Sequence, residues 1–153
     1  MALPRIDPLA AALTALGVAE MLLGPGDGNR AVSAVAVVAC TLPLAWRRTR
    51  PLVPLFAIAL ALIAQVPLGG FLIGATVTPL IALAFALYAC GRQLAGRWEL
   101  AAAALGVVIV SATRIAVDPA AGEMGQAALT FVAVSLPLLV GRWVRGQGLL
   151  QRR

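Results

Sequence analysis

The side chains most able to do chemistry in this chain are charged groups inside long apolar segments. Glu20 and Arg114 are two such residues, and ionisable groups at membrane depth are usually functional. One hypothesis is that they form an ion pair. Another is that they line a small outward-facing polar pocket with Gln65, Thr76 and Thr78. The simpler alternative is that both reach water, because each lies within about two turns of a segment end.

Residues for several other chemistries are missing. The chain contains no histidine, which excludes histidine-based triads, most zinc sites and a phosphoacceptor histidine within it. Cys40 and Cys90 lie inside or at the end of apolar segments, so we expect buried thiols without a disulfide or a metal. No nucleotide-binding motif is present. We therefore predict no cofactor and no enzymatic activity for this chain.

The elements that must position these residues are apolar helices. Apolar residues make up 61% of the chain and charged residues 12%, and the charged share is about half of that in a soluble domain. From Leu52 to Tyr88 the sequence is almost continuously apolar. A single helix of that length would measure about 55 Å, against a hydrocarbon core of about 30 Å. It must therefore fold back, and Pro67-Leu68-Gly69-Gly70 is the turn signal available.

The predicted fold is all-α, a polytopic membrane bundle of six short transmembrane helices. They cover approximately residues 9–23, 31–46, 52 to the turn at 67–70, that turn to 88, 100–117 and 126–140. Residues 1–145 form the transmembrane domain and 146–153 begin a cytoplasmic signalling linker. The first segment carries Glu20, so an alternative is an interfacial first helix, with five spans and an outer N-terminus.

The basic residues predict the orientation. All twelve are arginine, clustered between apolar runs, which is a topology signal and argues against a nucleic-acid surface. With both termini in the cytoplasm, ten arginines lie inside, whereas Arg30 and Arg114 lie outside with the acidic residues Asp27, Asp118 and Glu123. Each tryptophan neighbours an arginine cluster at a predicted inner boundary, as expected for an interfacial belt. The predicted inner anchors are Trp46, Arg47, Arg48, Arg50, Trp98, Arg142, Trp143 and Arg145.

Prolines and glycines inside the apolar segments indicate how the helices pack. Pro43, Pro54, Pro79 and Pro137 lie within predicted spans, where they act as hinges or are simply accommodated by neighbouring helices. The stretch 70–74 matches the small-xxx-small packing pattern.

The last segment continues through Arg142-Trp143-Val144-Arg145. We interpret it as a rod that leaves the membrane, although Gly146 and Gly148 argue against full rigidity.

Three motifs resemble the N-terminal membrane region of actinobacterial sensor histidine kinases, of the type paired with LuxR-like response regulators. They are the apolar–Arg-Arg-x-x-Pro-Leu junction in residues 41–52, the stretch from Ala86 to Arg92, and Gly141 to Arg145 followed by Gln151-Arg152-Arg153. The resemblance covers the whole chain in order and spacing.

The resemblance implies a membrane sensor and anchor that passes a membrane or small-molecule stimulus through its last helix. The parent protein would be a homodimeric kinase at the cell membrane, with a cytoplasmic kinase module absent from this chain and a response regulator as partner. The lipid bilayer is the direct partner of this chain, and no nucleic acid is expected. The alternative is an independent multi-pass protein, such as a transporter or channel subunit.

Overall fold

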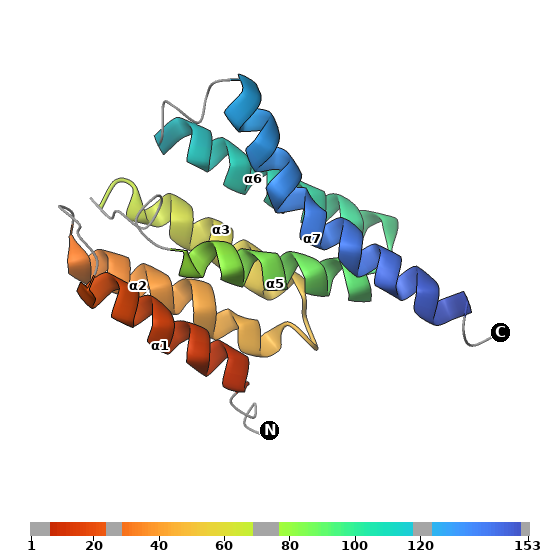
Figure 1. Cartoon of the computed structure of the whole chain (residues 1–153), viewed down its shortest axis with the longest axis horizontal. Coiled ribbons are helices and arrows are strands. Elements are labelled where there is room, and N and C mark those ends of the chain that lie inside the picture. Colours follow the sequence, from red (N-terminus) through yellow and green to blue (C-terminus); the bar gives the residue numbers. More distant parts are fainter. Residues whose placement is uncertain (1–6, 24–28, 69–76, 118–123, 151–153) are drawn as a thin grey trace.

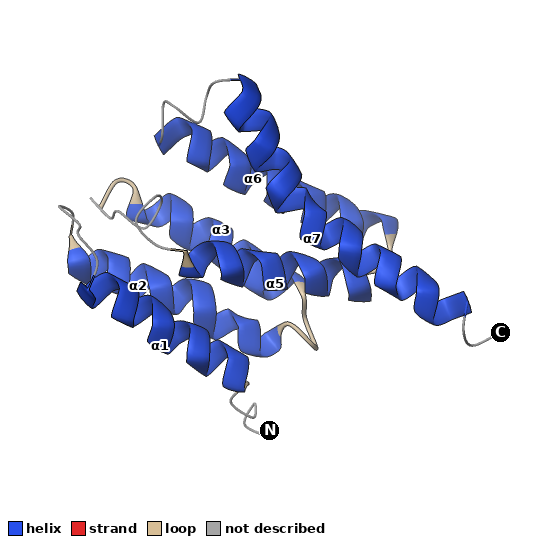
Figure 2. Ribbon diagram, in the orientation of Figure 1, coloured by secondary structure: helices blue, strands red, loops and turns tan. Residues whose placement is uncertain are grey.

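The computed structural model describes residues 7–23, 29–68, 77–117 and 124–150, and this part of the chain is helical (Figure 1). Within those ranges there is no strand (Figure 2). The all-α prediction is therefore confirmed. The small-xxx-small pattern at 70–74 lies outside the described residues. The described residues form six α-helices and one 3-10 helix, which are α1 (Pro8–Leu23), α2 (Arg30–Thr41), η1 (Leu42–Trp46), α3 (Leu52–Gln65), α5 (Thr78–Gln93), α6 (Arg97–Val117) and α7 (Met124–Leu150).

Local capping explains where three of these helices begin. The Asp7 carboxylate accepts a hydrogen bond from the Leu9 amide ahead of α1, and Asn29 does the same for two amides of α2. Helix α6 begins at Arg97, three residues before the predicted start. There the Glu99 carboxylate accepts hydrogen bonds from the amides of Ala95 and Gly96 at 3.3 and 3.1 Å. Because of this cap, the polar segment that was predicted as a link forms the first turn of α6.

The prolines occupy two kinds of position. Pro54 and Pro79 lie in the first turns of α3 and α5, where the missing amide would have no helical partner. Pro43 lies in η1, where α2 tightens into a 3-10 helix. Pro137 lies inside α7, and the ribbon of α7 bends along its length (Figure 1). Pro43 thus lies where the helix type changes, and Pro137 lies within the interior of a helix.

Helix α7 extends further than its predicted span. The sequence predicts a span over about 126–140 whose helix continues through Arg142–Arg145, and α7 is a continuous helix of 27 residues from Met124 to Leu150. It therefore crosses the expected boundary between residues 145 and 146 without a break. At 1.5 Å per residue its length is about 40 Å.

Consecutive helices run in opposite directions, so the start of α1 and the end of α7 lie at the same end of the bundle (Figure 1). We call this the basic end, because η1 and Arg47–Arg50 also lie there. The opposite end holds the end of α1 and the start of α5.

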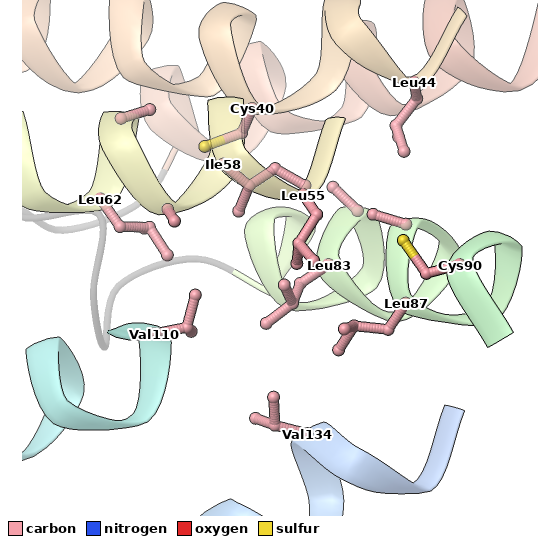
Figure 3. Packing of buried hydrophobic residues seen from close by; sticks show 14 of the residues in the cluster. Cys40, Leu44, Leu55, Ile58, Leu62, Leu83, Leu87, Cys90, Val110 and Val134 are labelled. Carbon is pink, nitrogen blue, oxygen red and sulfur yellow. The ribbon is translucent and has the colours of Figure 1, made fainter. Parts of the chain in front are cut away.

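Helix α5 is the central element, because it contacts every other described helix. Its buried residues include Leu83, Leu87 and Cys90, which join one core cluster with residues from all the other α-helices (Figure 3). Cys40 and Cys90 are both free and fully buried in that cluster, as predicted for small hydrophobic side chains.

The outside of the bundle is apolar as well. Each described helix exposes large hydrophobic side chains, and Leu23 is 87% and Trp98 88% exposed. Among the described residues, two helices, over Arg97–Ala116 and Ala128–Gly148, are long and apolar enough to cross a membrane. Pro8–Leu23, Arg30–Trp46 and Leu52–Gln65 are apolar but shorter.

Candidate functional site

The start of α5 is capped by an acidic side chain from another helix. Its own N-cap residue, Val77, supplies no side-chain hydrogen bond. Instead, Oε2 of Glu20 on α1 accepts hydrogen bonds from the Thr78 amide at 3.2 Å and from the Thr78 hydroxyl at 2.8 Å. A carboxylate is stabilised there by the unpaired amides and by the positive end of the helix dipole.

Two members of the predicted polar set, Glu20 and Thr78, are thus brought together. Arg114 is partly buried near the end of α6 and forms no ion pair with Glu20 in the described part of the chain. The ion pair was one of the open hypotheses for Glu20, and in the structure its carboxylate accepts from the donor pair at the α5 terminus. Gln65 is 2% exposed at the end of α3, and Thr76 lies outside the described residues.

The other end of α5 is capped by a basic side chain. Nη1 of Arg145, on α7, donates to the carbonyl oxygens of Leu94 at 2.6 Å and Gln93 at 3.2 Å. A cation is favourable at a helix C-terminus. Arg145 was predicted as an interfacial anchor, and in the structure its guanidinium holds α7 against the end of α5.

Helices α5 and α7 touch through their backbones. A Cβ added at Gly91 would collide with the carbonyl oxygen of Leu138, and one at Gly141 with that of Tyr88. Both obstacles are main-chain atoms, which cannot rotate away. The two glycines therefore allow a close approach of the helices that a side chain at either position would obstruct.

At the basic end, Arg47 joins three elements. Its Nη2 lies 3.0 Å from Oδ2 of Asp7, and its guanidinium lies 5.7 Å from the centroid of the Phe85 ring on α5. Its carbonyl oxygen accepts a hydrogen bond of 2.9 Å from Nε2 of Gln93. Arg47 therefore connects the start of α1, the segment after η1 and the end of α5.

A partly open cavity of about 540 Å³ lies beside Arg47. We call it the basic pocket, and three arginines and two aromatic rings contribute to its wall. It is lined by Arg47, Arg48, Phe85, Tyr88, Ala89, Arg92 and Gln93.

The remaining predicted anchors lie on the surface. Trp46, Trp98 and Trp143 are 39%, 88% and 66% exposed. The exposed arginines among these anchors are Arg48, Arg50 and Arg142. Arg48 is the exposed predicted anchor that lines the basic pocket.

Several residues of this region were not predicted from the sequence. Asp7 before Pro8 has the signature of a helix N-cap, so its capping role was recoverable, whereas its pairing with Arg47 joins residues 40 positions apart. The residues next to Gly91 and Gly141 in the sequence do not mark these two glycines as helix-packing positions. Nothing in the sequence around Phe85 and Gln93 predicts a special role, and only the fold brings both residues beside Arg47.

These features define a helical bundle whose central helix is capped at both ends by charges from its neighbours. Residues 4–153 match the family model described as Domain of unknown function (DUF7134). The chain belongs to that family. No curated protein and no solved structure matches it.

Proposed function

We propose that the chain is a membrane-embedded bundle of six spans with both termini in the cytoplasm. The supporting observation is the apolar outer surface, because monomeric soluble proteins rarely expose such extensive apolar area. The exposed Trp46, Trp98 and Trp143 suit the headgroup region, where an amphipathic ring is stable.

The short helices limit how the bundle fits a bilayer. Helix α3 has 14 residues, or about 21 Å, against a hydrocarbon core of about 30 Å. Six spans therefore require local thinning of the bilayer or flanking arginines that extend to the headgroups.

We further propose that this bundle is the sensor and anchor portion of a two-component histidine kinase. The observation that carries this is the course of α7, which continues as one helix to Leu150. Cβ atoms added at Gly146 and Gly148 would meet nothing within 4 Å, so the last turns project beyond the bundle. A stimulus that shifts α5 would reach this projecting rod through Gly141 and Arg145.

The first experiment is to read the gene past the codon for Arg153. We expect an open frame that continues into a heptad-patterned helix with a histidine, followed by a glycine-rich nucleotide-binding motif. A stop codon at that point contradicts the kinase proposal.

If the frame continues, autophosphorylation of the intact protein in lipid nanodiscs tests signal transfer. We expect Gly141→Ala to change the rate severalfold and Gly146→Ala to leave it unchanged. Solute flux in proteoliposomes, with no effect on phosphorylation, would favour a transporter or channel subunit.

A further inference from the structure

We propose that the basic pocket binds the phosphate group of an anionic membrane lipid. This inference rests on the membrane embedding proposed above and does not require a kinase module. The pocket lies at the basic end, beside the contacts that hold α5 and α7 together.

The pocket carries excess positive charge. Arg47 and Arg48 follow η1, and Arg92 lies in the last turn of α5, so two separate elements supply its three guanidinium groups. Asp7 pairs with Arg47. Among the described residues, this is the carboxylate that pairs with an arginine of the pocket. The pocket therefore keeps a net positive charge that an anion would balance.

Arg47 also retains an unused donor. While Nη2 faces Asp7, Nη1 is buried and has no hydrogen-bond partner among the described residues. Buried donors are normally satisfied. Arg47 lines the pocket, and guanidinium groups bind phosphate oxygens through paired, charge-assisted hydrogen bonds. A phosphate in the pocket is therefore a suitable acceptor for this donor after a rotation of the Arg47 side chain.

The shape of the pocket favours a lipid over free phosphate. Its lining runs along α5 from Arg92 to Phe85, a rise of about 10 Å. Arg48 and Arg92 lie at the interfacial end, whereas Phe85 and Tyr88 lie deeper along α5, where the Arg47 guanidinium faces the Phe85 ring. A ligand with a phosphate and an adjoining acyl chain matches both parts, whereas free phosphate matches the arginines alone.

A ligand in the basic pocket would affect the contact between α5 and α7. Gln93 lines the pocket and donates its side-chain amide to the carbonyl of Arg47, while its own carbonyl accepts from Arg145. A lipid that repositions Arg47 or Gln93 therefore acts one hydrogen bond away from the cap that holds α7.

The test uses the full chain purified in neutral detergent, with bound lipids counted by native mass spectrometry. It is titrated with dioleoylphosphatidylglycerol or dioleoylphosphatidylcholine, with and without inorganic phosphate. We compare Arg48→Gln/Arg92→Gln with the control Arg50→Gln/Arg97→Gln. Both doubles remove two exposed arginines from the same end of the bundle, and the control pair lies outside the pocket lining.

We expect phosphatidylglycerol to bind roughly tenfold more tightly than phosphatidylcholine, the pocket double to abolish that preference, and the control double to keep it. Equal loss in both doubles, or equal binding of both lipids, overturns the proposal. Competition by inorganic phosphate at equal concentration also overturns it and indicates a soluble phosphate ligand. Alkaline extraction of membranes tests separately whether the protein is embedded in the bilayer. A protein that is not embedded can therefore be distinguished from an embedded protein whose pocket binds no lipid.

Discussion

At the scale of single residues, the charges of this chain stabilise helix ends. Glu20 accepts two hydrogen bonds at the start of α5, and Arg145 donates two at its end. Each charge has the sign that complements the helix dipole. Because the two caps come from α1 and α7, they also tie the first and last helices to the central one.

Replacing Glu20 with Ala should lower the free energy of unfolding by about 1–2 kcal/mol. The change leaves the amide and the hydroxyl of Thr78 without their acceptor. Reversible unfolding in mixed detergent micelles, followed by circular dichroism, measures the effect.

The control is Arg114→Ala, which we expect to cost less than about 0.5 kcal/mol. In a double-mutant cycle the two changes should be additive. A coupling energy above about 1 kcal/mol would restore the Glu20–Arg114 ion pair as the dominant interaction.

Arg145→Gln should destabilise the bundle by about 1–2 kcal/mol, because the carbonyls of Gln93 and Leu94 lose a charged donor. Arg142→Gln is the matched control on the same helix, since Arg142 is exposed. The same unfolding assay applies, and equal effects of both changes would reduce Arg145 to a general interfacial charge.

At the scale of elements, the α5–α7 contact depends on having no side chain at two positions. Gly91 and Gly141 each face a backbone carbonyl of the partner helix. A well-packed interface tolerates little added volume. The position of α7, and of its projecting turns, is thereby set by α5.

Gly141→Ala should push α5 and α7 apart and lower stability by about 1–3 kcal/mol. Gly146→Ala, on the same helix, meets nothing within 4 Å and should raise stability by up to about 1 kcal/mol through helix propensity. Thermal unfolding of the two variants in one detergent compares them directly. If both variants gain stability, the close contact is absent in solution.

At the scale of the whole molecule, the bundle is apolar inside and outside, and its cationic side chains gather mainly at one end. The hydrocarbon of a bilayer accommodates an apolar surface, whereas exposure of the same surface to water costs free energy. The gathering of Arg47, Arg48, Arg50 and Arg92 at the basic end fits a cytoplasmic location for that end.

Labelling with a membrane-impermeant maleimide tests this topology in a background with Cys40 and Cys90 replaced by Ala. We expect Asn29→Cys to react in intact cells, and Thr49→Cys and Ala95→Cys to react only after permeabilisation. Reaction of Thr49→Cys in intact cells would contradict the orientation. An N-terminal tag accessible from outside would favour the five-span alternative.

The starts of α1 and α3 and the ends of α1 and α6 follow from the sequence to within a residue or two, because strong turn signals bound those apolar runs. The start of α6 and the last turns of α7 did not, since Arg97-Trp98-Glu99 and Gly146–Leu150 are locally polar or glycine-containing. The start of α6 depends on a cap from Glu99, and the last turns of α7 continue a helix that contacts α5 at Gly141.

By itself, the sequence determined the helical class, the buried thiols and the segregation of arginines, and it offered a shared polar region for Glu20 and Thr78 as one open hypothesis. These features are set by composition and by patterns a few residues long. The tertiary structure decided that Glu20 and Arg145 cap the same helix, that Gly91 meets Gly141, and that Asp7, Arg47 and Phe85 converge. Those contacts join residues far apart in the chain, so they exist only once the packing of α5 brings its neighbours within bonding distance.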